Sequence, residues 1–308
     1  MYSMNNPDKY CLATVTSENY FQWTMTMLYS FVATNPWFKG DIVVICKGLP
    51  PRMAADLMLF ENVKLVEPSD ALLDRLIELG HELPQFASLN ARFFSLETFG
   101  LSGYKKLLFL DSDMVVVKSI EELFALPELL YACAQLCYYK GKGRNISTFE
   151  SEAFTDGTDN QALFFEKPVN TGFMLIDGTV LNPTNYNGLI NLIEPSLWKN
   201  NNFTYTDELV INHYFRNQVS LLDTRYNFRA RAARIIREKE SISFKDAKII
   251  HYYSTFKPWN FGEVFTSSAN NMNWIKAYET WYMWYVAFLK FYHLQKKLTN
   301  LQLNNRAK

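Results

Sequence analysis

The chain has 308 residues, of which 48% are hydrophobic and 20% charged, a composition that indicates a folded globular protein and excludes a disordered one. Its 31 Lys and Arg balance its 31 Asp and Glu, which argues against general nucleic-acid binding because that needs a basic surface. Aromatic residues reach 16%, a share that suits both a core and a site for flat or sugar-like ligands.

The first half of the chain alternates short apolar runs with amphipathic stretches. We expect strands at Tyr10–Val15, Asp41–Cys46, Val63–Val66 and Lys106–Leu110. We expect helices at Tyr20–Ala33, Leu49–Glu61 and Ser88–Thr98. Because parallel strands need crossover helices between them, this order predicts one Rossmann-like α/β domain with a mostly parallel central sheet.

The second half is less regular. We expect strands at Leu129–Gln135, Thr171–Ile176 and Ile249–Tyr252, and a helix at Asp207–Arg216. The polar stretch Tyr138–Val169 is expected to be a long loop, and compact domains usually keep such loops for function.

The stretch Trp274–Leu294 is apolar and rich in aromatic residues, but Lys276, Glu279 and Lys290 interrupt it, so that it falls short of a transmembrane span. Two interpretations stay open: a helix packed on the domain, or an interfacial helix that contacts a membrane surface or a second copy of the chain. The second interpretation is favoured by a basic tail of Lys296, Lys297, Arg306 and Lys308. We therefore divide the chain into a domain of residues 1–262 and a helical extension of residues 263–308.

The cysteines and the N-terminus concern the cellular setting. Cys11, Cys46 and Cys133 lie in apolar runs, where Cys usually behaves as a small buried hydrophobe. The spacing between Cys133 and Cys137 does not match the CxxC spacing of a zinc or redox site. The first fifteen residues lack the basic and apolar regions of a secretory signal. We therefore expect a cytoplasmic protein, with membrane-surface contact as the alternative, in which the glycosylation patterns at Asn145 and Asn202 arise by chance.

The segment Lys106–Val117, KLLFLDSDMVVV, carries the chemistry. An apolar strand delivers Asp111 and Asp113 at its carboxyl end, the edge at which open α/β sheets bind ligands. If the chain stays extended there, the two side chains point the same way and can hold Mn²⁺ or Mg²⁺ between hard oxygen ligands. A turn built on Asp residues is the structural alternative, but it does not explain two charges between apolar runs.

A phosphatase of the haloacid-dehalogenase type would use the same Asp-x-Asp letters, with the first Asp as nucleophile. In that class the motif usually lies close to the start, whereas 110 residues precede it here, and no later Gly-Asp-x-x-x-Asp pattern follows. We therefore disfavour this reading.

Further motifs, in order, give the chain a specific resemblance. From Tyr10 to Asn260 it resembles glycosyltransferase family 8, the family of glycogenin, galactinol synthase and bacterial lipopolysaccharide galactosyltransferases. The resemblance implies a GT-A type fold and a retaining hexosyltransferase. It also implies a UDP-sugar donor, UDP-glucose or UDP-galactose in the first place, and a bound Mn²⁺ or Mg²⁺. The acceptor, a carbohydrate, a lipid-linked sugar or a protein, is left open.

The resemblance also assigns residues to the nucleotide donor. The start Ala13–Tyr20 resembles the family's uracil-binding segment, and Arg92 stands where the family places a basic residue against the donor. The Asn-x-Gly motif Asn170-Thr171-Gly172, which leads into the strand expected at Thr171–Ile176, would contact the sugar. Donor-contact candidates are Thr14, Thr16, Asn19, Tyr20, Arg92, Ser112, Asn170, Gly172 and Lys257, with Tyr20 as the stacking residue. Asp156 and Asp159 are weaker candidates for a further sugar-binding Asp.

The remaining motifs supply catalytic and metal-binding candidates. His251, followed by Lys257-Pro258-Trp259, resembles the family's third metal ligand and its phosphate-binding Lys, so the metal ligands would be Asp111, Asp113 and His251. Asp207 and Glu208 resemble the family's Asp-Gln helix start, but Glu208 replaces the Gln.

The Glu208 departure leaves two functions open. The first is an active enzyme in which Asp207, Glu208 and Lys257 act at the reacting sugar, with front-face attack favoured and a carboxylate nucleophile as the alternative. The second is a catalytically weak nucleotide-sugar-binding protein whose C-terminal helix binds a membrane or a partner.

Overall fold

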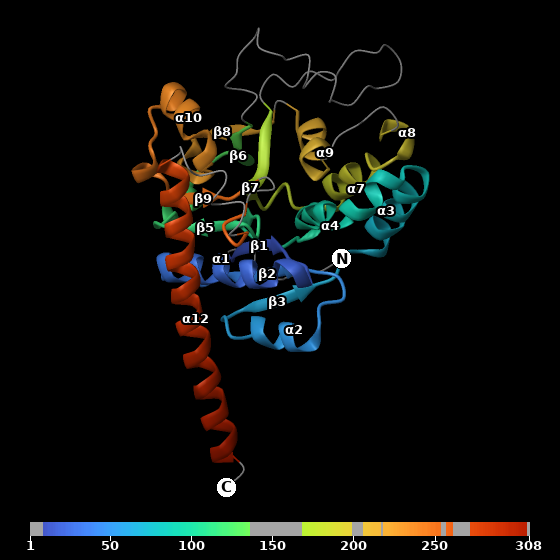
Figure 1. The fold of residues 1–308 in the computed structure, drawn as a ribbon. Helices are drawn as coiled ribbons and strands as arrows, with labels where there is room; N and C mark the ends of the chain where they lie inside the picture. Colours follow the sequence, from blue (N-terminus) through green and yellow to red (C-terminus); the bar gives the residue numbers. More distant parts are fainter. Residues whose placement is uncertain are drawn as a thin grey trace.

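The computed structural model describes residues 9–135, 168–198, 206–216, 218–253, 257–260 and 272–306. Its centre is a seven-stranded sheet in the order β3-β2-β1-β4-β7-β6-β8 (Figure 1). The strands are β1 (Tyr10–Val15), β2 (Asp41–Ile45), β3 (Val63–Val66), β4 (Lys106–Leu110), β6 (Leu130–Ala134), β7 (Val169–Asp177) and β8 (Ser220–Leu222).

Strands β3, β2, β1 and β4 run parallel, and β6 is parallel to β8, whereas β7 runs antiparallel to both β4 and β6. The expectation of a mostly parallel sheet is confirmed. Because β7 is reversed, its first residues lie beside the last residues of β4, with Phe173 opposite Leu110.

The central strands are buried on both faces, which explains why they are apolar without alternation. Cys11 and Ala13 of β1 belong to one core cluster, whereas Leu12 between them belongs to another. Phe109 and Leu108 of β4 divide in the same way. Cys133 is buried as well, so the prediction of buried, structural cysteines is confirmed for Cys11, Cys46 and Cys133.

Helices cover the two faces of the sheet. The helices are α1 (Phe21–Thr34), α2 (Pro51–Leu57), α3 (Asp70–Glu82), α4 (Asn90–Phe93), α7 (Pro183–Asn191), α8 (Pro195–Trp198), α9 (Asp207–Tyr214), α10 (Ala233–Glu240) and α12 (Met272–Arg306). The first core cluster contains residues of α3, α7 and α9, and the second contains residues of α1, α2 and α12. In Figure 1, α3, α7 and α9 are drawn on the right of the molecule and α12 on the left.

A second, two-stranded sheet pairs β5 (Met114–Val116) with β9 (Ile249–His251) in antiparallel fashion. Met114 lies opposite His251, so this pairing brings the end of β9 to the residues that follow β4. The backbone N–H of Tyr252 also donates to the carbonyl of Asp113 at 2.9 Å.

The C-terminal helix α12 passes along α1 and extends beyond the sheet (Figure 1). Trp281 and Phe288 are buried against the domain, and Tyr292 donates to the carboxylate of Asp56, which also pairs with Lys296. This outcome matches the packed-helix interpretation, and the domain division at residue 262 stays a prediction. Within the residues described, no helix combines the length and the apolar character that crossing a membrane requires.

Some elements differ from the sequence-based expectation. The stretch expected to be helical at Ser88–Thr98 is helical but divided, because the short helix α4 lies between 3-10 segments at Pro84–Leu89 and Phe94–Gly100. Every side chain from Phe93 to Phe99 is buried, so the segment has no solvent-facing side to shape one regular helix. Helices α3, α7 and α10 and strands β5 and β8 were not predicted from the sequence. The predicted loop Tyr138–Val169 lies outside the described residues up to position 167, together with Cys137, Asn145, Asp156, Asp159 and Asn202.

Candidate metal and donor site

The candidate site lies at the edge where β1 and β4 end and β7 begins. Parallel strands present their carboxyl ends at one edge, and the reversed β7 adds its amino end to that edge. The backbone N–H of Asp111 donates to the carbonyl of Gly172 at 2.8 Å, which joins the end of β4 to the start of β7.

Asp111 and Asp113 converge because the chain turns between them. Residues 111–113 form a turn between β4 and β5 and not the extended segment that we expected, so strand alternation is the wrong reason for their convergence. The Ser112 hydroxyl holds the turn, since it donates to the carbonyl of Val15 and lies 2.9 Å from the hydroxyl of Thr24.

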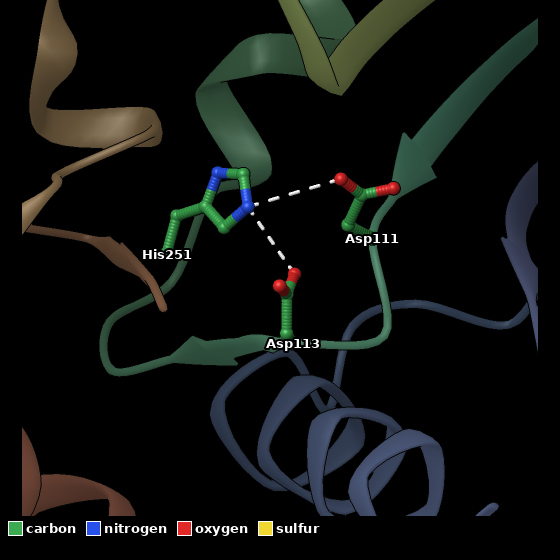
Figure 2. Close-up of side chains that lie close together, drawn as sticks. All are labelled: Asp111, Asp113 and His251. Carbon is green, nitrogen blue, oxygen red and sulfur yellow. Dashed lines mark ion pairs between the residues drawn. The ribbon is translucent and has the colours of Figure 1, made fainter. Parts of the chain in front are cut away.

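His251 completes a group of three metal-binding side chains (Figure 2). Its Nε2 lies 3.2 Å from Oδ1 of Asp113 and 3.8 Å from Oδ2 of Asp111. One ligand atom from each of the three residues lies within 4.8 Å of the others, which is the spacing that a single cation can bridge. The structure therefore brings together three side chains that are separated by up to 140 positions in the sequence.

The protein compensates the charges of this group only in part, through the ion pair between Lys257 and Asp113. Desolvation and then the charge on Asp113 raise the pKa of Asp111 well above its usual range. Desolvation opposes ionisation of Asp113 too, but Lys257 and His251 lower its pKa below its usual range. Burial lowers the pKa of His251, which favours the neutral imidazole that a metal requires. Within the described residues, Oδ1 of Asp113 is buried and has no hydrogen-bond donor in good geometry.

Gly172 leaves the space that this group occupies. A Cβ atom at position 172 would lie 2.6 Å from Oδ2 of Asp111 and 2.7 Å from Cε1 of His251. Both contacts are closer than real Cβ atoms show, so any larger residue would push a predicted metal ligand aside. The glycine of the Asn-x-Gly motif therefore leaves room for the side chains of Asp111 and His251.

The start of α9 places Asp207 and Glu208 beside β7. Asp207 accepts hydrogen bonds from Ser95 at 2.7 Å and from Thr171 at 3.3 Å, and desolvation raises its pKa. Desolvation raises the pKa of Glu208 to about 7. Both predicted carboxylates thus lie at the same edge as the three candidate ligands.

A row of buried amides connects Glu208 to His251. Nδ2 of Asn170 donates to Oε2 of Glu208 at 2.8 Å, and Oδ1 of Asn170 accepts from Nδ2 of Asn227 at 2.7 Å. Oδ1 of Asn227 in turn lies 2.8 Å from Nδ1 of His251. Asn227 was not predicted as a site residue, because it lies outside any strand or helix and has no motif around it.

A buried arginine supports the other side of Glu208. Nε2 of Gln135 donates to Oε1 of Glu208 at 2.5 Å, and Oε1 of Gln135 accepts from Arg229 at 3.0 Å. Arg229 is fully buried and also donates to the carbonyl of Ala134 at 2.6 Å. Both Gln135 and Arg229 were missed, although a polar residue directly after the apolar strand β6 resembles the pattern that revealed Asp111.

The small hydroxyl residues predicted to contact the nucleotide lie close together. Thr14 and Thr16 are buried, and their hydroxyls lie 3.5 Å from Ser112 and 2.7 Å from Thr24, respectively. Their side chains therefore hold β1, α1 and the aspartate turn together. The missed residue Thr24 lies at the centre of this group.

The remaining predicted donor contacts are more accessible. Asn19 and Arg92 are exposed, and Arg92 lies one turn before Ser95, which binds Asp207. Tyr20 is 39% exposed and meets Trp259 edge to face at 6.1 Å. Their contact with a donor stays a prediction.

Lys257 reaches the group from the segment that leads to Trp259. Its Nζ pairs with Oδ2 of Asp113 and donates to the carbonyl of Tyr252 at 2.8 Å. Trp259 stacks on Trp23 of α1, with ring centroids 4.2 Å apart and planes within 7° of parallel. Trp281 of α12 packs against both indoles. The aromatic cluster of Trp23, Trp259 and Trp281 thus fixes the segment that carries Lys257.

Comparison with known proteins agrees with this geometry. The profile described as Glycosyl transferase family 8 matches residues 11–262, which is most of the chain. The chain belongs to glycosyltransferase family 8. Among curated proteins, galactinol synthase 3 of Arabidopsis thaliana is 25% identical over 168 residues, which are 51% of this chain and 47% of that protein. The match thus spans about half the length of the relative.

Solved structures of similar shape support the GT-A fold expected for this family. The galactosyltransferase LgtC, crystallised with donor and acceptor sugar analogues, aligns with a TM-score of 0.66 at 16% identity, over 90% of this chain and 95% of LgtC. The glycosyltransferase GlyE of Streptococcus pneumoniae aligns with a TM-score of 0.54 at 20% identity, over 90% of this chain and 64% of GlyE. These similarities establish the fold of this family 8 member.

Proposed function

We propose that this family 8 protein is a retaining glycosyltransferase that moves a hexose from a UDP-sugar to an acceptor in a metal-dependent reaction. UDP-glucose and UDP-galactose are the leading donors. The observation that carries the proposal is the convergence of Asp111, Asp113 and His251 at the carboxyl edge of the sheet, in a chain of this family.

The residues at this point fit a divalent cation. Two carboxylates and a neutral imidazole offer oxygen and nitrogen ligands of the kinds that Mn²⁺ accepts, and Mg²⁺ is the alternative. A cation would also satisfy the buried Oδ1 of Asp113. When bound there, the metal would supply Lewis-acid stabilisation of the charge on the leaving diphosphate.

Side chains of the protein would supply the remaining charge and orientation. Although burial opposes it, the Asp113 carboxylate raises the pKa of Lys257, so that the ammonium stays charged and can face a phosphate oxygen. The exposed guanidinium of Arg92 offers forked donors for phosphate or sugar. Asp207 and the amide of Asn170 would accept from and donate to sugar hydroxyls.

The nucleoside would lie against the start of α1. Asn19 and Tyr20 are exposed there, and Tyr20 offers a ring face for uracil. Thr14, Thr16 and Ser112 would shape this end mainly through the backbone, because their hydroxyls bond within the protein.

Two routes would retain the anomeric configuration, and we favour front-face attack by the acceptor on the side from which UDP leaves. Both oxygens of Glu208 accept hydrogen bonds from Gln135 and Asn170, which lowers their nucleophilicity. A double displacement through Glu208 is the alternative, and it would leave a covalent glycosyl ester.

A panel of UDP-sugars with Mn²⁺, read by UDP release, tests the proposal. We expect release with UDP-glucose or UDP-galactose, inhibition by EDTA and recovery on adding Mn²⁺. Proton NMR of the first-formed product distinguishes retention from inversion, and mass spectrometry of the protein detects a Glu208 ester. Binding of UDP and Mn²⁺ without turnover of any donor would instead favour the catalytically weak binding protein.

One observation favours an additional role for α12 in peripheral contact. Leu294, Leu298 and Leu301 are 56%, 45% and 58% exposed and recur at helical spacing toward the C-terminal end of α12. Such a stripe suits a membrane surface or a second copy of the chain. Co-sedimentation with anionic vesicles, compared with the Leu294→Ser/Leu298→Ser variant, tests the membrane, and light scattering tests the dimer.

A further inference from the structure

The hydrogen bonds between Glu208 and His251 have a defined direction. Above its pKa of about 7, Glu208 is a carboxylate that can only accept hydrogen bonds, so the Asn170 group that faces it must be the amide nitrogen. Its oxygen then faces Asn227 and must receive the Asn227 amide nitrogen. The remaining oxygen of Asn227 faces Nδ1 of His251, which must therefore carry the imidazole proton.

The opposite end of this row is fixed as well. A guanidinium can only donate, so Arg229 requires the oxygen of Gln135 and turns the Gln135 nitrogen toward Glu208. Arg229 is fully buried, and its second donation to the Ala134 carbonyl holds the guanidinium in place. Glu208 thus receives two fixed donors, and each amide in the row has one allowed orientation.

The contact at the other ring nitrogen of His251, Nε2, favours the opposite tautomer. Oδ1 of Asp113 lies 3.2 Å from Nε2 and would favour a proton there, which would remove the lone pair that a metal needs. The shorter contact of 2.8 Å to Asn227 favours the proton on Nδ1 instead.

We propose that Asn227 is a positioning residue that holds His251 in the Nδ1–H tautomer, with its Nε2 lone pair directed at the two aspartates. Glu208 sets this tautomer from a distance through Asn170. The proposal rests on the proposed metal-dependent function, and it gives the Glu that replaces the family's Gln a defined structural role.

The Glu208→Gln variant should reverse the direction of the hydrogen bonds from residue 208 through Asn170 and Asn227 to His251. The new amide must still accept from Gln135, because Arg229 fixes Gln135, so its nitrogen would face Asn170. Asn170 would then turn its oxygen to position 208 and its nitrogen to Asn227. Asn227 would turn in response, and its nitrogen would face His251, which favours the proton on Nε2 and removes the metal-directed lone pair.

The Asn227→Asp variant should also weaken Mn²⁺ binding, but through a repulsive contact between two oxygens. Its new carboxylate would accept the proton of His251, but its second oxygen would face the Asn170 oxygen that Glu208 holds in place. Combining both substitutions removes the conflict, because the reversed Asn170 would donate to the new carboxylate. In the double variant, every hydrogen bond in the row again joins one donor and one acceptor, and the His251 proton lies on Nδ1. The double variant also has the same net charge as the original chain.

The two readouts are Mn²⁺ affinity by calorimetry and the imidazole nitrogen shifts of ¹⁵N-His-labelled, metal-free protein at pH 8. The chain has four histidines, and a His251→Gln variant assigns the relevant signals. Loss of a residue that orients a metal ligand typically weakens metal affinity about 10- to 100-fold, which we expect for each single variant. The double variant should recover most of the lost affinity and the Nδ1–H shift pattern. Glu61→Gln, an exposed change at the far end of β3, should alter neither readout.

The outcome separates the proposal from a simple charge effect. If charge alone mattered, Asn227→Asp would strengthen Mn²⁺ binding, and that result would overturn the proposal, as would a double variant no better than the single variants. Should the original chain bind no Mn²⁺, the proposed function fails, but the shifts of the metal-free protein still decide whether Asn227 sets the tautomer.

Discussion

Lys257 pairs through its Nζ with Oδ2 of Asp113, the carboxylate whose other oxygen faces Nε2 of His251. Asp113 thus links the ammonium group of Lys257 to the candidate metal position. Of the two aspartates it is the more buried, with 11% of its side chain exposed against 42% for Asp111. This relationship makes Asp113 the most informative residue to change.

The Asp113→Asn variant should lose UDP-sugar turnover and bind Mn²⁺ at least tenfold more weakly, because an amide removes one negative ligand charge. The fold should persist, since Asn has nearly the same size and Lys257 keeps its bond to Tyr252. Calorimetry, UDP release and thermal unfolding measure the three quantities. Turnover and metal dependence equal to the original protein would reject the site.

The Gly172→Ala variant should impair Mn²⁺ binding without changing any ligand, because the added methyl group would lie within 2.7 Å of both Asp111 and His251. The matched control is Gly100→Ala, where the new methyl would meet Tyr186 at an ordinary 3.6 Å. Metal titrations of both variants make the comparison. Equal affinities would show that the ligands move aside without cost.

The Trp281→Ala variant should lower the free energy of unfolding by about 3–5 kcal/mol, the usual cost of deleting a buried Trp side chain. Trp281 is 3% exposed and packs against Trp23 and Trp259, so the loss should also loosen the Lys257 segment and weaken UDP binding. Tyr282, the next residue of α12, is 47% exposed, and Tyr282→Ala should cost much less. Urea unfolding of both variants measures the difference, and equal costs would contradict the packed arrangement of α12.

The Asp41→Asn variant should show a pH-dependent loss of stability. Although burial opposes ionisation, hydrogen bonds and charge from Lys64 and Lys9 lower the pKa of Asp41. A lowered folded-state pKa stabilises the fold above the unfolded value of 3.8, and this contribution disappears as the pH falls through the folded value. The variant should therefore be less stable by about 1–3 kcal/mol at pH 7, and the deficit should shrink below pH 4.

Urea unfolding of Asp41→Asn at pH 7 and pH 3 measures this change. The control is Asp74→Asn on the exposed side of α3, which should cost little at either pH. A deficit of the same size at both pH values would show that the disturbed hydrogen-bond geometry around residue 41, and not the carboxylate charge, explains the effect.

The sequence predicted the metal group because each ligand carries a local signal. Asp111 follows a continuous apolar strand, and His251 stands at a fixed spacing before Lys257-Pro258-Trp259. The strands β1, β2 and β4 were equally clear, since burial on both faces makes them uniformly apolar. Helix α3 was missed although Ser69 caps it and Leu72, Leu76 and Leu79 repeat at helical spacing. That signal was present in the sequence.

Asn227, Gln135 and Arg229 were missed for a different reason. Gln135 and Arg229 lie 94 positions apart, and Gln135 and Glu208 lie 73 apart, so their contacts exist only after the sheet has formed. Asn227 follows a 3-10 turn and has no periodic neighbours. Long-range polar pairs of this kind leave no spacing in a single sequence, whereas the substitution at Glu208 was visible and only its meaning was hidden.

The near-parallel indoles of Trp23 and Trp259 offer a use that goes beyond stability. Two chromophores this close couple their electronic transitions, so the pair should give a split circular dichroism band that neither ring shows alone. One ring belongs to α1 and the other to the Lys257 segment. The band would therefore provide a label-free signal that reports whether the Lys257 segment stays packed against α1 during a nucleotide titration.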